Sequence, residues 1–237
     1  MTKTIFVVGC SYSHHDIYVK PKQTWPCLLQ DDLKCRIINC SVPGNSNLSY
    51  FYRLKELQYQ FGKPDKVIVQ LTSPDRVFLH RKNVPICNIT KRKGKDYYYD
   101  IHKEGFGDAG ISITPGSITR QSFTKGVNKQ YNIKRRELVT YFRTFASDDT
   151  VHWLSLKEML LIDSYFKDVI FFSWNTQYSY ITTDEPWANE CHVNYIGSIN
   201  DMLSTEEFNN YSHIPGLDNH FNAVGHCAVK ELIKPHV

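Results

Sequence analysis

Short apolar runs alternate with an amphipathic stretch along the first third of the chain. Residues 3–11, 35–42 and 66–72 are rich in β-branched and aromatic side chains. They are apolar at successive positions, as in strands that are covered on both faces of a parallel sheet. Between the last two runs we expect a helix that Asn45 or Asn47 caps. Its apolar stripe consists of Leu48, Phe51, Leu54, Leu57 and Phe61.

The same pattern returns in the second half of the chain. A helix in two pieces is predicted over 136–166, and a fourth strand over 169–174. A loop of about 40 residues is expected to follow this strand. The last helix is predicted from Asn222, a good N-cap, to Lys234, because Pro235 cannot continue it.

This order of strands and helices predicts an α/β fold, a three-layer, doubly wound and mostly parallel sheet. Residues 77–135 interrupt it with a basic run, three consecutive tyrosines and Gly- and Thr-containing stretches. We expect a β-rich insertion there, next to the carboxyl edge of the sheet. The prediction is a single domain over residues 1–237 that contains this insertion.

Composition and charge add little to this picture. The chain has 237 residues, a net charge of +4 and an ordinary apolar share of 41%. The stretch 78–136 holds 13 Lys or Arg against 4 Asp or Glu, so it is either a surface for an anionic partner or a solvated loop. The seven cysteines form no C-x-x-C pair, which favours reduced thiols.

The hydropathy of the chain favours a cytoplasmic protein. No apolar run approaches the roughly 18 residues of a membrane span, and the apolar stretch near the N-terminus is shorter than that of a signal peptide. We therefore expect no membrane span. We also expect no nucleic-acid partner.

Three segments that can carry chemistry lie at predicted strand ends. Gly9–Ser13 (GCSYS) follows the first strand, and Asn39–Asn47 (NCSVPGNSN) follows the second. The third segment, Asp218–His226, precedes the last helix. A serine on a strand-to-helix turn presents its hydroxyl at the carboxyl edge, where backbone N–H groups can hold an oxyanion. A histidine with a nearby carboxylate can act as its base.

Two histidines near the end of the chain compete for the role of base. His220 precedes the predicted cap Asn222 and stays at the edge of the sheet. His226 lies more than a turn inside the helix, about 6 Å further along its axis. We therefore choose His220, with Asp218 to orient it, and expect His226 to be a surface or helix residue.

These motifs resemble those of the SGNH or GDSL hydrolase family. The order is Gly-Cys-Ser near residue 10, a glycine near 40 and Asp-x-His near the C-terminus. The Gly-Cys-Ser form is similar to a branch found in bacteria and phages. The resemblance covers the chain in order, apart from 77–135 and 175–212. It implies a flavodoxin-like fold with Ser11 as nucleophile, His220 as general base and Asp218 as its partner.

The resemblance also implies where an oxyanion would bind. The N–H groups of Ser11 and Gly44 match two donors, and Asn47 belongs with the substrate-binding residues. The family has Gly-x-Asn-Asp after the third strand, whereas this chain has Leu-Thr-Ser-Pro-Asp. Either Thr72 or Ser73 supplies a hydroxyl there, or the third donor is absent.

The implied activity is hydrolysis of an ester. The family most often removes acetyl or other short acyl groups from glycans or lipids, so we expect a small-molecule or glycan ester as substrate. We expect neither a cofactor nor a metal. Two alternatives remain: a sugar O-acyltransferase that uses the same residues, and a catalytically inactive glycan-binding protein. The sequence indicates no oligomeric state.

Overall fold

The fold was analysed in a computed structural model. It describes residues 2–14, 19–42, 44–74, 76–80, 90–91, 99–100, 110–113, 139–141, 144, 148–174, 178, 193–214 and 218–237.

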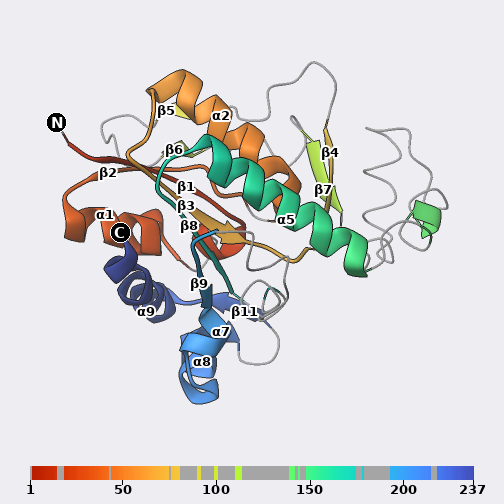
Figure 1. Ribbon diagram of the computed structural model, residues 1–237. Helices are drawn as coiled ribbons and strands as arrows, with labels where there is room; N and C mark the ends of the chain where they lie inside the picture. The colour runs from red at the N-terminus through yellow and green to blue at the C-terminus, as the bar shows by residue number, and fades with distance from the viewer. Residues whose placement is uncertain are drawn as a thin grey trace.

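A five-stranded parallel sheet forms the centre of the molecule (Figure 1). Its strands, in spatial order, are β2 (Arg36–Asn39), β1 (Thr4–Val8), β3 (Lys66–Leu71), β8 (Val169–Ser173) and β9 (Tyr195–Ser198). Every neighbouring pair is parallel. The predicted α/β class and parallel sheet are confirmed.

Helices cover both faces of this sheet. Helices α1 (Trp25–Leu33) and α9 (Ala223–Ile233) lie on one face, and α2 (Tyr50–Phe61) and α5 (Asp148–Tyr165) lie on the other (Figure 1). Each pair also packs helix against helix. The result is the predicted three-layer arrangement. Helices cover both faces of the central sheet, so its strands can be apolar on both sides.

The burial of β1 shows why its sequence is apolar at successive positions. Phe6 and Val8 belong to the core on the side of α2 and α5, whereas Ile5 and Val7 belong to the core on the side of α1 and α9. All four side chains are fully buried. Alternate residues of a strand face opposite sides, so a strand between two helical layers is apolar throughout.

The strand order determines where a crevice can form. The chain runs from β1 outward to β2 and then returns past β1 to β3, so the helices after β1 and β2 lie on opposite faces. The loops that leave the carboxyl ends of β1 and β3 therefore diverge. Such a switch point is where open α/β sheets bind their ligands.

Several elements differ from the sequence-based expectations. Helix α1 was not predicted, and the expected loop after β8 is wrong over its second half. That half contains β9, α7 (Ile199–Met202), α8 (Thr205–Tyr211) and β10 (Ser212–Ile214). These elements have 3 to 7 residues, too few to show a clear period in the sequence.

The predicted caps have different outcomes. Ser46, rather than Asn45 or Asn47, caps the 3₁₀ turn η3 (Asn47–Ser49) that leads into α2, and its Oγ accepts the N–H of Leu48 at 3.3 Å. Asn222 caps α9 as predicted, because its Oδ1 accepts the N–H of Gly225 at 2.9 Å.

The described parts of the predicted insertion are four short strands. β4 (Val77–His80) pairs with β7 (Gly110–Ile113), and β5 (Thr90–Lys91) pairs with β6 (Tyr99–Asp100), both antiparallel. β4 lies against η3, which follows the carboxyl end of β2. The remainder of 77–135, and most of the predicted helix before α5, lie outside the described residues.

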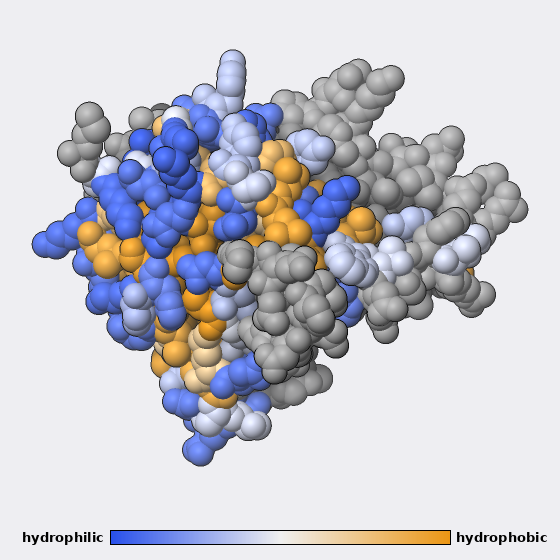
Figure 2. Space-filling view, in the orientation of Figure 1, coloured by the Kyte–Doolittle hydropathy of each residue, from blue (hydrophilic) through white to orange (hydrophobic). Residues whose placement is uncertain are grey.

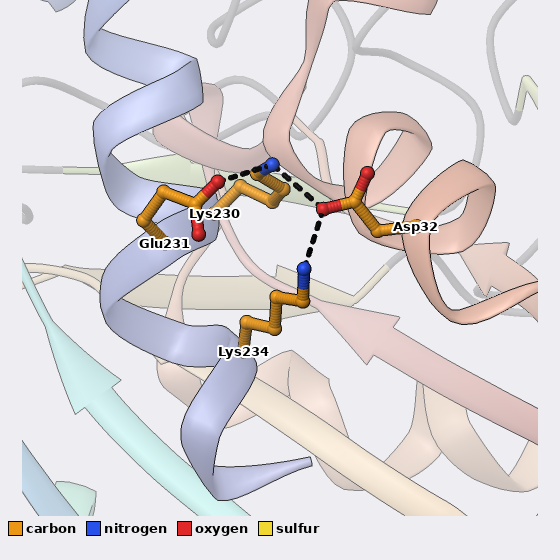
Figure 3. A network of polar contacts seen from close by, with 4 residues as sticks. All are labelled: Asp32, Lys230, Glu231 and Lys234. Carbon is orange, nitrogen blue, oxygen red and sulfur yellow. Dashed lines mark hydrogen bonds and ion pairs between the residues drawn. The ribbon is translucent and has the colours of Figure 1, made fainter.

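Charged side chains link α9 to α1 at the periphery. Lys230 of α9 and Lys234, which directly follows this helix, both point at Asp32 of α1, at 2.7 and 2.9 Å (Figure 3). The hydrogen bonds from Lys230 and Lys234 hold the pKa of Asp32 below its usual range. Because the side chains of Asp32 and Lys234 are partly exposed to solvent, the ion pairs contribute far less to stability than the apolar contacts beneath them.

The outer surface of α2 and α5 carries several exposed apolar or aromatic side chains. Figure 2 shows hydrophobic residues among hydrophilic ones over this part of the molecule. The exposed residues are Tyr52, Tyr59, Trp153, Leu160, Leu161 and Tyr165. None of the helices in the described part of the chain is both long enough and apolar enough to cross a membrane.

Glu158 makes the stability of the helical layer depend on pH. Its carboxylate on α5 accepts the N–H of Phe51 on α2 at 2.8 Å, and burial raises its pKa to about 7. The folded state therefore holds a proton that the unfolded chain releases near pH 4.5. As pH rises from 4.5 through 7, this group lowers the free energy of unfolding. Urea unfolding should show Glu158→Gln more stable than the parent at pH 9, with the gain vanishing near pH 4.

Glu207 provides a control of opposite sign. Its carboxylate accepts hydrogen bonds from the N–H and hydroxyl of Ser204 in a capping box, and these bonds lower its pKa. Glu207 therefore raises the free energy of unfolding at pH values above its unfolded pKa, and this stabilisation is lost as pH falls. Glu207→Gln should therefore be less stable than the parent at pH 9 and equal to it at low pH. A gain from Glu158→Gln that is constant with pH would contradict the burial argument.

Candidate active site

Ser11 lies at the carboxyl end of β1, at the switch point of the sheet. β1 ends at Val8, and Ser11 opens the 3₁₀ turn η1 (Ser11–Ser13) three residues later. Val8 is in register with Val69 of β3. Ser11 and Thr72 each stand three residues beyond this pair, on their own strands' carboxyl side. The turn after β1 and the residues after β3 therefore come to the same edge, as predicted.

His220 reaches this edge from the other end of the chain. It belongs to β11 (Asp218–Phe221), which pairs with β10 and contacts η1. Its Nε2 lies 2.7 Å from the Oγ of Ser11, across 209 residues of sequence. Both residues are half-buried. This is the hydrogen-bond distance that activation of a serine by a histidine requires.

A buried polar network supports the serine turn from beneath. The Oε1 of Gln70 accepts hydrogen bonds from the Cys10 N–H at 3.0 Å, the Cys10 thiol at 3.2 Å and the Ser13 hydroxyl at 3.4 Å. The indole N–H of Trp25 donates to the Ser13 Oγ at 3.0 Å. The Asn39 amide donates to the Ser13 carbonyl at 2.7 Å. Because all these groups are buried and paired, the turn has one favoured geometry.

Gln70 was missed by the sequence reasoning, although the sequence contains a hint. It is a polar residue inside the otherwise apolar run VIVQL, and its side chain is fully buried. A buried amide needs partners, so such a residue predicts a polar neighbour on the adjacent strand. Here that neighbour is the turn that carries Ser11.

Gly9 lets this turn approach β3 closely. A Cβ at position 9 would lie 2.9 Å from both the Cβ and the Oε1 of Gln70, and 3.0 Å from the Ser13 Oγ. The carbonyl of Gly9 also accepts hydrogen bonds from the N–H of Val42 at 3.1 Å and from the amide of Asn45 at 3.3 Å. Gly9 thus joins the turn after β1 to β3 itself and to the segment that follows β2.

Cys10 is the other nucleophilic side chain of this turn. It is fully buried, and its thiol donates to Gln70. Ser11 is half-buried and contacts His220 instead. The turn therefore directs the hydroxyl toward the histidine and the thiol into the core.

The backbone N–H groups of Ser11 and Gly44 are the two predicted oxyanion donors. Gly44 has a φ of 69°, the left-handed conformation that glycine adopts easily. It lies in a turn in which Asn45 N–H donates to Val42 O at 3.1 Å. Among the described residues, no hydrogen bond engages the N–H of Ser11 or of Gly44.

Asn47 uses its amide to hold η3 against the end of β3. Its Oδ1 accepts the Thr72 N–H at 2.9 Å, and its Nδ2 donates to the Thr72 carbonyl and to the Ser155 Oγ, both at 3.2 Å. The hydroxyl of Tyr178 is a further partner of this amide. The side chain is 2% exposed. The structure thus gives Asn47 contacts within the protein, where the sequence analysis placed it among the substrate-binding residues.

Thr72 and Ser73 are the two residues with hydroxyl groups that follow β3. The Thr72 Oγ1 is buried and has no hydrogen-bond partner among the described residues. Ser73 is half-buried and has an interaction partner. Burying a hydroxyl without a hydrogen-bond partner costs folding free energy. The Thr72 hydroxyl therefore contributes nothing to stability that would explain its presence at the end of β3.

The structure separates the two candidate histidines. His226 lies in α9 and is 2% exposed, so the expectation of a surface position is wrong and that of a helical one is confirmed. Its Nδ1 accepts the N–H of Trp25 at 3.3 Å, at the first residue of α1. Asp218 lies in β11, two residues before His220, but its side chain is outside the described part of the structure.

Solved structures with the same architecture are known. A protein from Desulfitobacterium hafniense DCB-2, assigned to the lipolytic proteins of the G-D-S-L family, aligns over 100% of both chains with a TM-score of 0.50 and 10% identity. The psychrotrophic esterase EstA from Pseudoalteromonas sp. aligns over 99% of this chain and 96% of its own, with a TM-score of 0.52 and 12% identity. This chain has the fold of the SGNH, or GDSL, hydrolases.

The resemblance read from the sequence is thereby confirmed for the fold. No family model and no curated protein matches the chain in sequence. On this SGNH-type sheet the three motif segments, after β1, after β2 and before α9, come together around Ser11.

The packing around Gly9 generates a prediction about activity. Gly9→Ala places a methyl group against the Gln70 Cβ, so the turn has to move. Overpacking of this kind costs about 1–3 kcal/mol of stability, and a displaced Ser11 should lose most of its reactivity toward an acyl ester such as p-nitrophenyl acetate.

Gly62→Ala is the matched control for this substitution. Gly62 has a φ of 82°, and no other residue lies near its added Cβ. It follows α2 at the opposite edge of the sheet, so its substitution should lower stability through backbone strain and leave activity unchanged. Equal activity in the two alanine variants would contradict the role given to the Gly9 contact.

Proposed function

We propose that this chain is a serine hydrolase that cleaves a carboxylic ester, with Ser11 as nucleophile and His220 as general base. The contact of 2.7 Å between Ser11 Oγ and His220 Nε2 is the observation that carries the proposal. The pair lies at the carboxyl edge of a parallel sheet, where ligands of such folds bind. The two structural neighbours, an esterase and a protein assigned to a lipolytic family, are consistent with ester hydrolysis.

The proposed reaction has two acyl-transfer steps. His220 takes the hydroxyl proton of Ser11 while Oγ attacks the ester carbonyl, which forms a tetrahedral oxyanion. The C–O bond to the alcohol then breaks, and His220 returns the proton to the leaving oxygen. In the second step His220 deprotonates water, the hydroxide attacks the acyl-serine, and the carboxylic acid leaves as Ser11 recovers its proton.

The oxyanion would be held by backbone groups. The N–H groups of Ser11 and Gly44 support this assignment, since neither is engaged by a hydrogen bond among the described residues. Preorganised donors of this kind stabilise the transition state because they need no rearrangement when charge develops.

For the third donor we choose Thr72 over Ser73. The Thr72 hydroxyl is buried without a partner in the described structure, at the strand end where the SGNH family carries an asparagine. A hydroxyl that lacks a partner in the resting protein can donate to an oxyanion without giving up an existing hydrogen bond.

Asp218 is proposed to orient the His220 imidazole. It lies two residues before His220 on β11, and residues two apart along a strand share a face. A carboxylate at the second ring nitrogen would fix the tautomer in which Nε2 accepts the serine proton.

The substrate class is proposed as a short-chain acyl ester, such as an acetyl group on a glycan or lipid. The support is the family resemblance of the motif segments together with the fold. The chain's own residues carry out every step of the proposed reaction.

Ser11→Ala tests the nucleophile. Hydrolysis of p-nitrophenyl acetate should fall by about 10³-fold or more, because the acyl group then has no oxygen to bind. Ser11 is half-buried, and among the described residues its Oγ is hydrogen-bonded to the His220 ring nitrogen alone, so the free energy of unfolding should change by less than about 1 kcal/mol. Retention of more than a few per cent of activity in a folded variant would refute the assignment.

The two histidines should respond differently to substitution. His220→Ala should lower kcat by about 10³-fold or more, as loss of the base does. His226→Ala removes the acceptor of the buried Trp25 N–H, so it should lower stability by about 1–3 kcal/mol. Its kcat should stay within about threefold of the parent. Steady-state kinetics and urea unfolding of both variants test these expectations. A large loss of kcat in His226→Ala and not in His220→Ala would overturn the choice of base.

Thr72→Val tests the third donor. The two side chains have nearly the same shape, so the variant loses only the hydroxyl. Since that hydroxyl has no described partner, stability should not fall, whereas kcat should fall by about 10²-fold. Ser73→Ala is the matched control and should retain kcat. An unchanged kcat in Thr72→Val would remove Thr72 from the oxyanion site.

A further inference from the structure

An aromatic ring holds the plane of the His220 imidazole. Tyr12 and His220 are stacked with ring centroids 5.0 Å apart and an interplanar angle of 11°. Tyr12 also stacks on Trp174, at 4.6 Å and 16°, and meets the edge of Phe221 at 5.3 Å and 68°. The histidine ring therefore belongs to an aromatic cluster at the edge of the sheet.

This cluster unites three separate parts of the chain. Tyr12 is the residue after Ser11 in η1, Trp174 follows directly after β8, and His220 lies in β11. Tyr12 is 7% exposed and packs in the core on the side of α1 and α9. The ring is packed too closely to turn freely, so the ring face on which the imidazole stacks has a fixed orientation.

We propose that Tyr12 is a positioning residue for His220. It holds the imidazole plane so that Nε2 meets the Ser11 Oγ, and its electron-rich face favours the positive charge that the ring gains on taking the serine proton. This inference rests on the proposed function of Ser11 and His220. The adjacency of Tyr12 and Ser11 couples the orientation of the base to the position of the nucleophile.

The physical basis is the quadrupole of the phenol ring. Offset-stacked rings attract each other, and a cation over an aromatic face is attracted further. A neutral imidazole thus gains orientation from the stack, and an imidazolium gains additional stabilisation. Both effects depend on the ring and not on the Tyr12 hydroxyl. Phenylalanine at position 12 should therefore preserve the orientation of His220, and leucine should not.

The kinetic test compares Tyr12→Phe, Tyr12→Leu and Phe172→Leu on p-nitrophenyl acetate. Phe172 is a fully buried ring of the same core cluster, and its described ring contact is with Trp25. Tyr12→Phe should keep kcat within about threefold of the parent. Tyr12→Leu should lower kcat by about 10- to 100-fold, since misorientation of a catalytic group has effects of that size, with KM nearly unchanged. Phe172→Leu should lower the melting temperature while keeping kcat.

A second readout does not depend on activity. In NMR spectra the ring protons of His220, assigned by comparison with His220→Ala, should be shifted upfield by the ring current of Tyr12. The shift should persist in Tyr12→Phe and disappear in Tyr12→Leu. His220 signals that are the same in Tyr12→Leu and the parent would overturn the proposal, as would a parental kcat in that variant.

The two readouts distinguish failure of this inference from failure of the proposed function. If Ser11→Ala and His220→Ala are inactive but Tyr12→Leu has the parental kcat, the hydrolase assignment stands and the role of Tyr12 is refuted. If Ser11→Ala retains activity, the proposed function is refuted, and the NMR comparison alone decides whether Tyr12 orients His220.

Discussion

The close contact between Gly9 and Gln70 is the constraint around which the rest of the site is arranged. It brings the turn after β1 against β3, so the Gln70 amide can accept the Cys10 N–H and thiol. These bonds bury the cysteine side chain and leave the next residue, Ser11, at the edge of the sheet. The strand order makes this edge the switch point of the sheet, since the helices after β1 and β2 lie on opposite faces.

The histidine is placed by a second set of contacts at the other end of the chain. Asn222 caps α9 through its Oδ1, and its Nδ2 donates to the carbonyl of Asn210 at 2.9 Å. Gly225 permits the close packing, because a Cβ there would lie 2.7 Å from the Tyr211 carbonyl. His226 then joins α9 to the start of α1. The position of His220 thus follows from how α9 docks.

The sequence was sufficient for the features that rest on local pattern. The strands β1, β2, β3 and β8 are visible because burial on both faces makes them apolar throughout, and the start of α9 is visible because Asn222 is a good cap. Ser11 and His220 were predicted to lie at one edge because motif order and strand ends coincide, and the structure places their side chains 2.7 Å apart.

Other features depend on contacts between distant segments, which a one-dimensional pattern does not encode. Helix α1 is short, and its buried face includes Gln30 and Pro26 beside Trp25 and Leu29. The edge strand β9 pairs on one side within the described sheet and is only partly buried. Gln70 and Tyr12 acquire their roles from neighbours 60 and 208 residues away, and His226 is buried because α9 packs on α1.

The most direct test of the central claim is to identify the residue that forms a covalent adduct. The protein would be treated with a serine-directed fluorophosphonate, digested and mapped by mass spectrometry, with and without His220→Ala. If Ser11 is the nucleophile and His220 its base, one adduct should form on Ser11, and it should form far more slowly without His220. Labelling of another residue, or labelling of Ser11 at the same rate in His220→Ala, would contradict it.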